Sequence, residues 1–88
     1  MNGGRSQVRV RLFAAARAAA DGENDVAVSA GSLAEVCACL IDLFGAPMAS
    51  VLERSSFLVN DVAWARRDHD RALADGSTVD VLPPFAGG

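Results

Sequence analysis

The chain has 88 residues, of which 51% are hydrophobic, and it carries a formal net charge of −3 at pH 7. This length allows one domain with a single modest core. No stretch free of charged residues approaches the roughly 20 residues of a membrane-spanning helix, and the acidic balance disfavours nucleic acid, so we expect neither a membrane nor a nucleic-acid partner.

The N-terminal part of the chain predicts two strands separated by a short helix. Residues 1–6 are a polar, glycine-containing lead-in that we expect to be flexible. In residues 7–13 apolar and polar side chains alternate, as they do in a half-buried strand. The alanine-rich residues 14–20 predict one or two helical turns, and residues 25–28 predict a second strand. Arg17 interrupts the apolar run, which argues against a targeting peptide.

The main helix is the clearest predicted element. Ser32 and Glu35 have the spacing of a capping box that opens a helix, and Gly45 has the usual place of a residue that ends one. Between them, apolar residues recur at helical spacing and predict one stripe packed against a sheet. The stripe consists of Leu33, Val36, Cys37, Leu40, Ile41 and Phe44.

The C-terminal half predicts a short helix and three more strands. Residues 48–54 suit a short helical segment. Residues 57–59 and 62–64 suit two strands joined by a tight turn. The charged residues 66–71 suit a solvated loop, and residues 78–82 suit a final strand.

These elements predict an α+β domain over residues 7–82. Only one helix is long enough to cover a sheet, so the economical arrangement is a mixed sheet of four or five strands packed on one main helix. The ubiquitin-like β-grasp is this arrangement, and its first and last strands are central and parallel. Residues 83–88 then form an extended C-terminal tail.

The tail reads Pro-Pro-Phe-Ala-Gly-Gly and carries the functional signal. The two prolines lack backbone N–H donors, so the tail cannot extend the sheet and leaves it as a stiff segment that reaches ~20 Å. The two glycines remove the side chains beside a terminal carboxylate, which makes the carboxylate of Gly88 the candidate reactive group. We expect a partner to bind the five residues before it. These are Pro83, Pro84, Phe85, Ala86 and Gly87.

Several short motifs occur in the order found in one known family. They are Leu12-Phe13-Ala14 with Arg17, Val59-Asn60, Leu73 with Asp75-Gly76, and the terminal Pro83-Pro84-Phe85-Ala86-Gly87-Gly88. Together they resemble the small sulfur-carrier subunit of molybdopterin synthase across nearly the whole chain. A terminal double glycine is shared with other sulfur carriers, whereas the two prolines are most similar to the molybdopterin group. One departure is Ser77, where the family usually has an acidic residue, and we expect it to alter at most a surface contact.

The resemblance implies a carrier that performs no catalysis alone and binds no cofactor. An E1-like adenylating enzyme would use ATP to adenylate Gly88, and a sulfurtransferase or cysteine desulfurase would supply the sulfur of a thiocarboxylate. The larger synthase subunit, in a heterotetramer, would then transfer that sulfur to cyclic pyranopterin monophosphate to form molybdopterin. The chain itself has no glycine-rich phosphate loop with a lysine, which agrees with activation by a partner.

Other functions stay open on the sequence alone. The recipient could be cysteine or thiamine biosynthesis or tRNA thiolation, and the chain could instead be a ubiquitin-like modifier or a non-covalent binding module. All eight basic residues are arginine, so the chain offers no lysine amine for self-conjugation.

The cysteines and the histidine have simpler interpretations. Cys37 lies in the helix stripe and is expected in the core, whereas Cys39 lies on another side with no cation to activate it as a persulfide carrier. Two cysteines two positions apart on a helix cannot form a disulfide with each other, which favours a reducing cytoplasm. His69 is expected to be a solvated loop residue, and no metal site is expected.

Three further residues are candidates for contacts with a partner. Trp64 could anchor an interface or close one end of the core, and the sequence favours neither. Phe85 lies beyond the sheet, so a partner pocket is the expected place for its ring. Arg17 matches a family position, but it could also simply end the short helix favourably.

Overall fold

A computed structural model describes residues 6–85. In chain order its elements are β1 (Ser6–Leu12), α1 (Ala15–Ala19), β2 (Asp25–Ala30), α2 (Leu33–Phe44), α3 (Ala46–Arg54), β3 (Ser56–Val59), β4 (Val62–Trp64), the 3-10 turn η1 (Arg66–Asp68) and β5 (Thr78–Leu82). None of the helices within residues 6–85 has the length and apolar character needed to cross a membrane.

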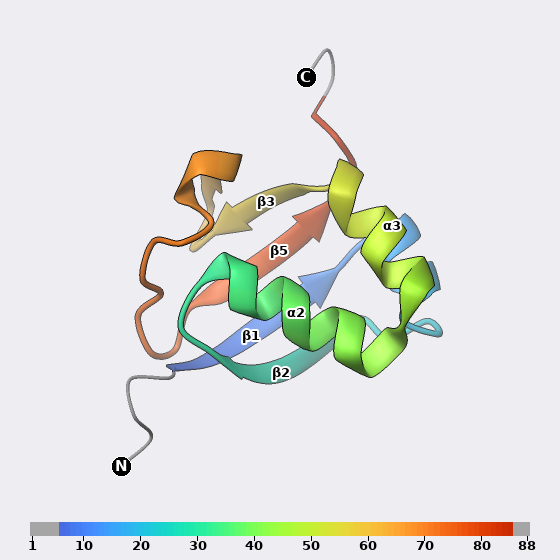
Figure 1. The fold of residues 1–88 in the computed structure, drawn as a ribbon, viewed down its shortest axis with the longest axis horizontal. Coiled ribbons are helices and arrows are strands. Elements are labelled where there is room, and N and C mark those ends of the chain that lie inside the picture. The colour runs from blue at the N-terminus through green and yellow to red at the C-terminus, as the bar shows by residue number, and fades with distance from the viewer. Residues whose placement is uncertain (1–5, 86–88) are drawn as a thin grey trace.

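The five strands form one mixed sheet in the order β2-β1-β5-β3-β4. The strands β1 and β5 are central and parallel, with Val10 opposite Val79, and the three other pairs are antiparallel. Figure 1 shows α2 crossing one face of this sheet, with α3 following it at one end. The predicted α+β arrangement with parallel central strands is therefore confirmed.

The core lies between α2 and the sheet face that it covers. Alternate residues of β1 and the inner residues of α2 are at most 1% exposed, and they are Val8, Val10, Leu12, Leu33, Val36 and Leu40. Full burial of one such leucine stabilises the fold by roughly 2 to 3 kcal/mol. The buried stripe of α2 is narrower than predicted, because Ile41 is 38% exposed and Cys37 and Phe44 only flank the core.

The ends of α2 follow the sequence signals closely. The hydroxyl of Ser32 accepts the N–H of Glu35 at 3.2 Å. The Glu35 carboxylate accepts the N–H of Gly31 at 2.7 Å, one residue before the donor that a capping box uses. Gly45 ends the helix with a φ of 85°, a conformation that a side chain would strain.

The second helix on this side, α3, is longer than the sequence predicted. It begins at Ala46, two residues before the predicted start. Pro47 lies in its first turn, where a missing N–H removes no helical hydrogen bond. Met48 and Leu52 are buried, so α3 adds to the core and packs on both α1 and α2.

Residues 66–71 are mostly exposed, as the sequence predicted, but two of their side chains contact aromatic rings of the sheet. The ring of His69 meets the ring of Phe57 edge-on, with 5.3 Å between the centroids, and the guanidinium of Arg71 lies 4.6 Å from the centroid of the Trp64 ring. The prediction that His69 is solvated is therefore wrong, and its partial burial lowers the pKa of its imidazole. Trp64 packs against the core, as one of its two interpretations expected.

Candidate functional site

The tail leaves the domain at the end of a central strand. Leu82 is the last residue of β5 and lies opposite Ser56 in the antiparallel pair with β3. Pro83 and Pro84 follow and are exposed, and because neither can donate a backbone hydrogen bond, the sheet ends here. Figure 1 shows the chain continuing away from the sheet beyond β5.

Phe85 is the last residue that the structure describes, and it is held on the domain. Its backbone N–H donates to the hydroxyl oxygen of Ser56 at 2.9 Å. Its side chain is 48% exposed and borders a hollow beside Glu53 and Arg54 at the end of α3. The tail leaves the sheet after Leu82, as expected, and it keeps a contact with the domain at Phe85.

The remaining residues of the predicted site lie outside the described range. These are Ala86, Gly87 and Gly88. The role of Gly88 as the reactive residue and the roles of the two residues before it stay predictions.

A largely apolar groove of about 410 Å³ lies beside the base of the tail. One wall is the turn from β1 to α1 with Phe13 and Ala14, a second is α3 with Val51 and Arg54, and Pro83 lines the third side. The fold thus brings a motif from the N-terminal part of the sequence next to the tail. The sequence does not reveal that residues 13–14 lie beside the tail, because only the pairing of β1 with β5 brings them together.

The turn that forms one wall of this groove is strained. Ala14 has a φ of 52° and a ψ of −122°, a conformation that glycine adopts readily and other residues rarely. Nothing in the sequence signals it, because a glycine is absent there. The Nε of Arg17 donates to the carbonyl oxygen of Leu12 at 3.4 Å and holds α1 against the end of β1. Arg17 also lies in the last turn of α1, so it has the helix-ending place that one interpretation gave it.

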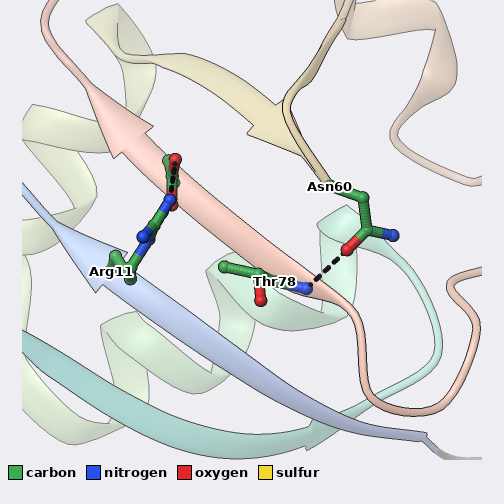
Figure 2. A network of polar contacts seen from close by, with 4 residues as sticks. Arg11, Asn60 and Thr78 are labelled. Carbon is green, nitrogen blue, oxygen red and sulfur yellow. Dashed lines mark hydrogen bonds and ion pairs between the residues drawn. The ribbon is translucent and has the colours of Figure 1, made fainter.

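A second feature that the sequence did not reveal lies on the sheet face opposite α2. The Nε of Arg11 donates to one carboxylate oxygen of Asp80 at 2.6 Å, and a second guanidinium nitrogen donates to the other oxygen at 2.8 Å. The side chain of Asp80 is 7% exposed and that of Arg11 is 44% exposed. Figure 2 shows the Arg11 guanidinium reaching from β1 to this carboxylate on β5. The hydrogen bonds and charge of Asp80 raise the pKa of Arg11.

Polar groups also fix the β3–β4 hairpin and the turn at residues 74–77, which both precede β5 in the chain. The side-chain oxygen of Asn60 accepts the N–H of Thr78 at 2.9 Å, as Figure 2 shows. The hydroxyl of Ser77 donates to the carbonyl oxygen of Ala74 at 2.7 Å, and Ser77 is 3% exposed. The expectation that Ser77 affects a surface contact is therefore wrong, since its side chain is buried beneath a turn whose other residues, 74–76, are exposed.

The two cysteines lie at the margin of the core rather than near the tail. Burial raises the pKa of the Cys37 thiol to about 11, which keeps it protonated and unreactive at neutral pH. The thiol of Cys39 lies 3.8 Å from the carbonyl oxygen of Ser29 on β2. Both cysteines are free thiols, as predicted.

Comparison with protein families identifies the chain. The sequence model of the ThiS family matches residues 10–88. The chain belongs to the ThiS family. This family assignment makes it a ubiquitin-like sulfur carrier, and the match extends from within β1 through the tail. Among curated protein sequences, none matches the chain.

Solved structures resemble this ThiS-family chain over almost its full length. The solution structure of small archaeal modifier protein 1 from Methanosarcina acetivorans has a TM-score of 0.80 and 25% identity, covering 98% of this chain and 100% of that chain. A chain of the complex of subunits 1 and 2 of molybdopterin-converting factor from Helicobacter pylori 26695 has a TM-score of 0.68 and 26% identity, with 93% and 99% covered.

A third solved structure is similar in fold alone. Urm1 from Trypanosoma brucei has a TM-score of 0.67 and 16% identity, covering 98% of this chain and 99% of that chain. These likenesses confirm the predicted ubiquitin-like β-grasp. They include both a molybdopterin-converting factor and a protein named as a modifier.

Proposed function

We propose that this ThiS-family chain carries sulfur for molybdenum cofactor biosynthesis, with Gly88 as the residue that carries it. The observation that supports this most is the place of the tail. The tail follows a central strand that is hydrogen-bonded on both sides, by β1 and by β3. Two prolines then direct the chain away from the sheet, so a partner would bind the tail beside this end of β5.

The chemistry proposed for Gly88 begins with its activation by a partner. A carboxylate is ionised at neutral pH and is a poor electrophile. Attack of one carboxylate oxygen on the α-phosphorus of ATP forms an acyl-adenylate and releases pyrophosphate. The terminal sulfur of a persulfide then displaces AMP and gives an acyl disulfide. A further thiol cleaves the S–S bond, which releases the thiocarboxylate and leaves a disulfide on the sulfur donor.

In these steps the folded domain would be the part of the carrier that each partner binds. We propose that an E1-like adenylating enzyme grips the carrier first, a sulfurtransferase or cysteine desulfurase supplies the persulfide, and a larger synthase subunit receives the thiocarboxylate. Two successive carriers would supply the two sulfur atoms that convert cyclic pyranopterin monophosphate into molybdopterin. In each complex Ala86 and Gly87 would lie in a narrow slot of the partner, because their small side chains permit close approach. A reducing cytoplasm would be the compartment for this chemistry.

Two observations favour molybdopterin as the destination of the sulfur. The likeness to a chain of the molybdopterin-converting factor complex extends over 93% of this chain. The prolines before Phe85 also resemble those of the molybdopterin carriers. The likeness to a small archaeal modifier protein favours a second function, in which the activated Gly88 is joined to amines of other proteins.

Mass spectrometry separates these two functions. The chain is expressed with its adenylating enzyme in cells, and the intact mass of the purified protein is measured. A gain equal to one oxygen-to-sulfur exchange, located at Gly88, is expected for a carrier. Loss of this gain when the protein is mixed with the pterin-binding subunit and cyclic pyranopterin monophosphate, with formation of molybdopterin, is expected for the proposed pathway. Adducts on lysines of other proteins without any sulfur exchange would instead identify a modifier.

A further inference from the structure

One hydroxyl group links the tail to the sheet. Pro83 and Pro84 have no backbone N–H, so the N–H of Phe85 is the first backbone donor after Leu82. This N–H donates to the hydroxyl oxygen of Ser56 at 2.9 Å. Ser56 also lies opposite Leu82 in the pairing of β3 with β5. The same residue therefore holds the chain on both sides of the two prolines.

Holding both ends of this short segment restricts its conformation strongly. Each proline fixes its own φ near −65°, so few conformations remain between Leu82 and Phe85. The Phe85 side chain is half exposed and borders a hollow lined by Glu53 and Arg54. The hydrogen bond from Phe85 thus fixes the position of this residue, the last that the structure describes, against β3.

The neighbouring serine has a different role and offers a matched comparison. The hydroxyl of Ser55 donates to the carbonyl oxygen of Val51 at 2.8 Å and closes the end of α3. No hydrogen bond joins Ser55 to the described part of the tail, residues 83–85. Replacing each serine in turn therefore distinguishes the loss of a contact with the tail from the loss of a contact within the domain.

We propose that Ser56 is a positioning residue for the tail, and that its hydroxyl fixes the place and direction in which the residues beyond Phe85 reach a partner. The part of this inference that concerns sulfur transfer rests on the proposed function. A partner that binds a tail already restricted in this way loses less conformational entropy on binding. One neutral hydrogen bond changes an equilibrium by about 2- to 12-fold, which is the size of the effect expected here.

Hydrogen exchange at the Phe85 amide tests the contact in the whole protein. The wild type is compared by NMR with Ser56→Ala, Ser56→Thr and Ser55→Ala. We expect Ser56→Ala to speed exchange at this amide by about 2- to 12-fold. Ser56→Thr keeps the hydroxyl and should retain the wild-type rate, as should Ser55→Ala. Unchanged exchange in Ser56→Ala, or a wild-type rate equal to that of an unstructured peptide, would overturn the proposal.

Kinetics of adenylation test the functional part. ATP–pyrophosphate exchange by the E1-like enzyme is measured at several concentrations of each carrier. We expect Ser56→Ala to raise the KM for the carrier by about 2- to 12-fold with kcat unchanged, and Ser56→Thr and Ser55→Ala to behave as wild type. Faster amide exchange in Ser56→Ala with an unchanged KM would overturn the positioning role. Absence of adenylation in the wild type would defeat the proposed function, while amide exchange would still decide whether Ser56 holds the tail.

Discussion

Arg11 and Asp80 lie opposite each other on the two central parallel strands and form a two-point ion pair, with 2.6 and 2.8 Å between the paired atoms. Their positions are unequal, because the side chain of Asp80 is 7% exposed and that of Arg11 is 44% exposed. An exposed guanidinium that loses its partner is hydrated, whereas a buried carboxylate that loses its partner stays desolvated. The pair joins β1 to β5, and loss of Arg11 should destabilise the fold more than loss of Asp80.

The first prediction follows from this asymmetry. Arg11→Ala should lower the free energy of unfolding more than Asp80→Ala does, and Arg11→Ala combined with Asp80→Ala should recover part of the loss. Urea unfolding at neutral pH measures all three variants. Arg9→Ala, an exposed position on the same strand face, is the control and should change stability little. Equal losses for Arg11→Ala and Asp80→Ala would contradict the role assigned to the buried carboxylate.

A second prediction concerns the strained turn after β1. Ala14→Gly should raise the free energy of unfolding by about 1 kcal/mol, because the strain of ~1 to 3 kcal/mol at a φ of 52° exceeds the entropy cost of a glycine. Ala15→Gly, at the first position of α1, is the matched control and should lower it by ~0.5 to 1 kcal/mol. Thermal and urea unfolding give both values. A loss of stability in Ala14→Gly as large as in Ala15→Gly would show that the turn is not strained.

A third prediction separates folding from function. Leu40→Ala removes a fully buried side chain of α2 and should lower the free energy of unfolding by ~2 to 5 kcal/mol. Leu43→Ala on the same helix removes a side chain that is 59% exposed and should have little effect. Sulfur loading per folded molecule should stay at the wild-type level in both, because neither residue lies near the tail. A specific loss of loading in folded Leu40→Ala would contradict this separation.

Features that depend on neighbours in the sequence were predictable, and features that depend on register were not. Alternation along β1 and helical spacing along α2 involve only local patterns, and they were sufficient to predict a mixed sheet on one main helix. The pair of Arg11 with Asp80 joins residues 69 positions apart, and only the alignment of β1 with β5 brings them together. His69 looked solvated between two aspartates, because its partner Phe57 lies on a separate strand.

The same distinction applies to the site. Pro83, Pro84 and Phe85 are exposed beyond the sheet, as the composition of the tail predicted. The contact of Phe85 with Ser56 depends on the pairing of β3 with β5, and neither residue type signals it. The sequence does not predict the conformation of Ala14 either, since alanine rarely adopts a φ of 52°.

A fourth prediction concerns the double glycine. Gly87→Ala and deletion of Gly88 should each abolish sulfur loading. The methyl group of the first variant would block the proposed narrow slot of the partner, and the deletion would leave the terminal carboxylate one residue short of its reactive position. The thermal transition should stay at the wild-type temperature in both variants, since the core formed by residues 6–85 extends from Val8 to Val81. Intact-mass analysis after expression with the adenylating enzyme measures loading. Gly3→Ala in the lead-in is the control, and full loading of Gly87→Ala would contradict the proposed fit.

The fifth prediction is a loss of stability at alkaline pH that depends on Cys37. Burial raises the pKa of this thiol from its ordinary value of 9.0 to about 11 in the folded protein. The folded state therefore favours the protonated thiol, and this contribution is fully present below pH 9 and is lost as the pH rises through 11. The chain has no tyrosine and no lysine, the other side chains whose ordinary pKa lies near this window.

The expected size of this effect is at most about 2 kcal/mol, because the thiol is only partly shielded from water. Urea unfolding between pH 8.5 and pH 11 measures it in the wild type, in Cys37→Ala and in Cys39→Ala. Cys37→Ala should be less stable at neutral pH, yet its stability should fall less steeply with rising pH than that of the wild type. Cys39→Ala should keep most of the wild-type slope. If Cys37→Ala retained the full slope, the alkaline loss of stability would have to originate at another group.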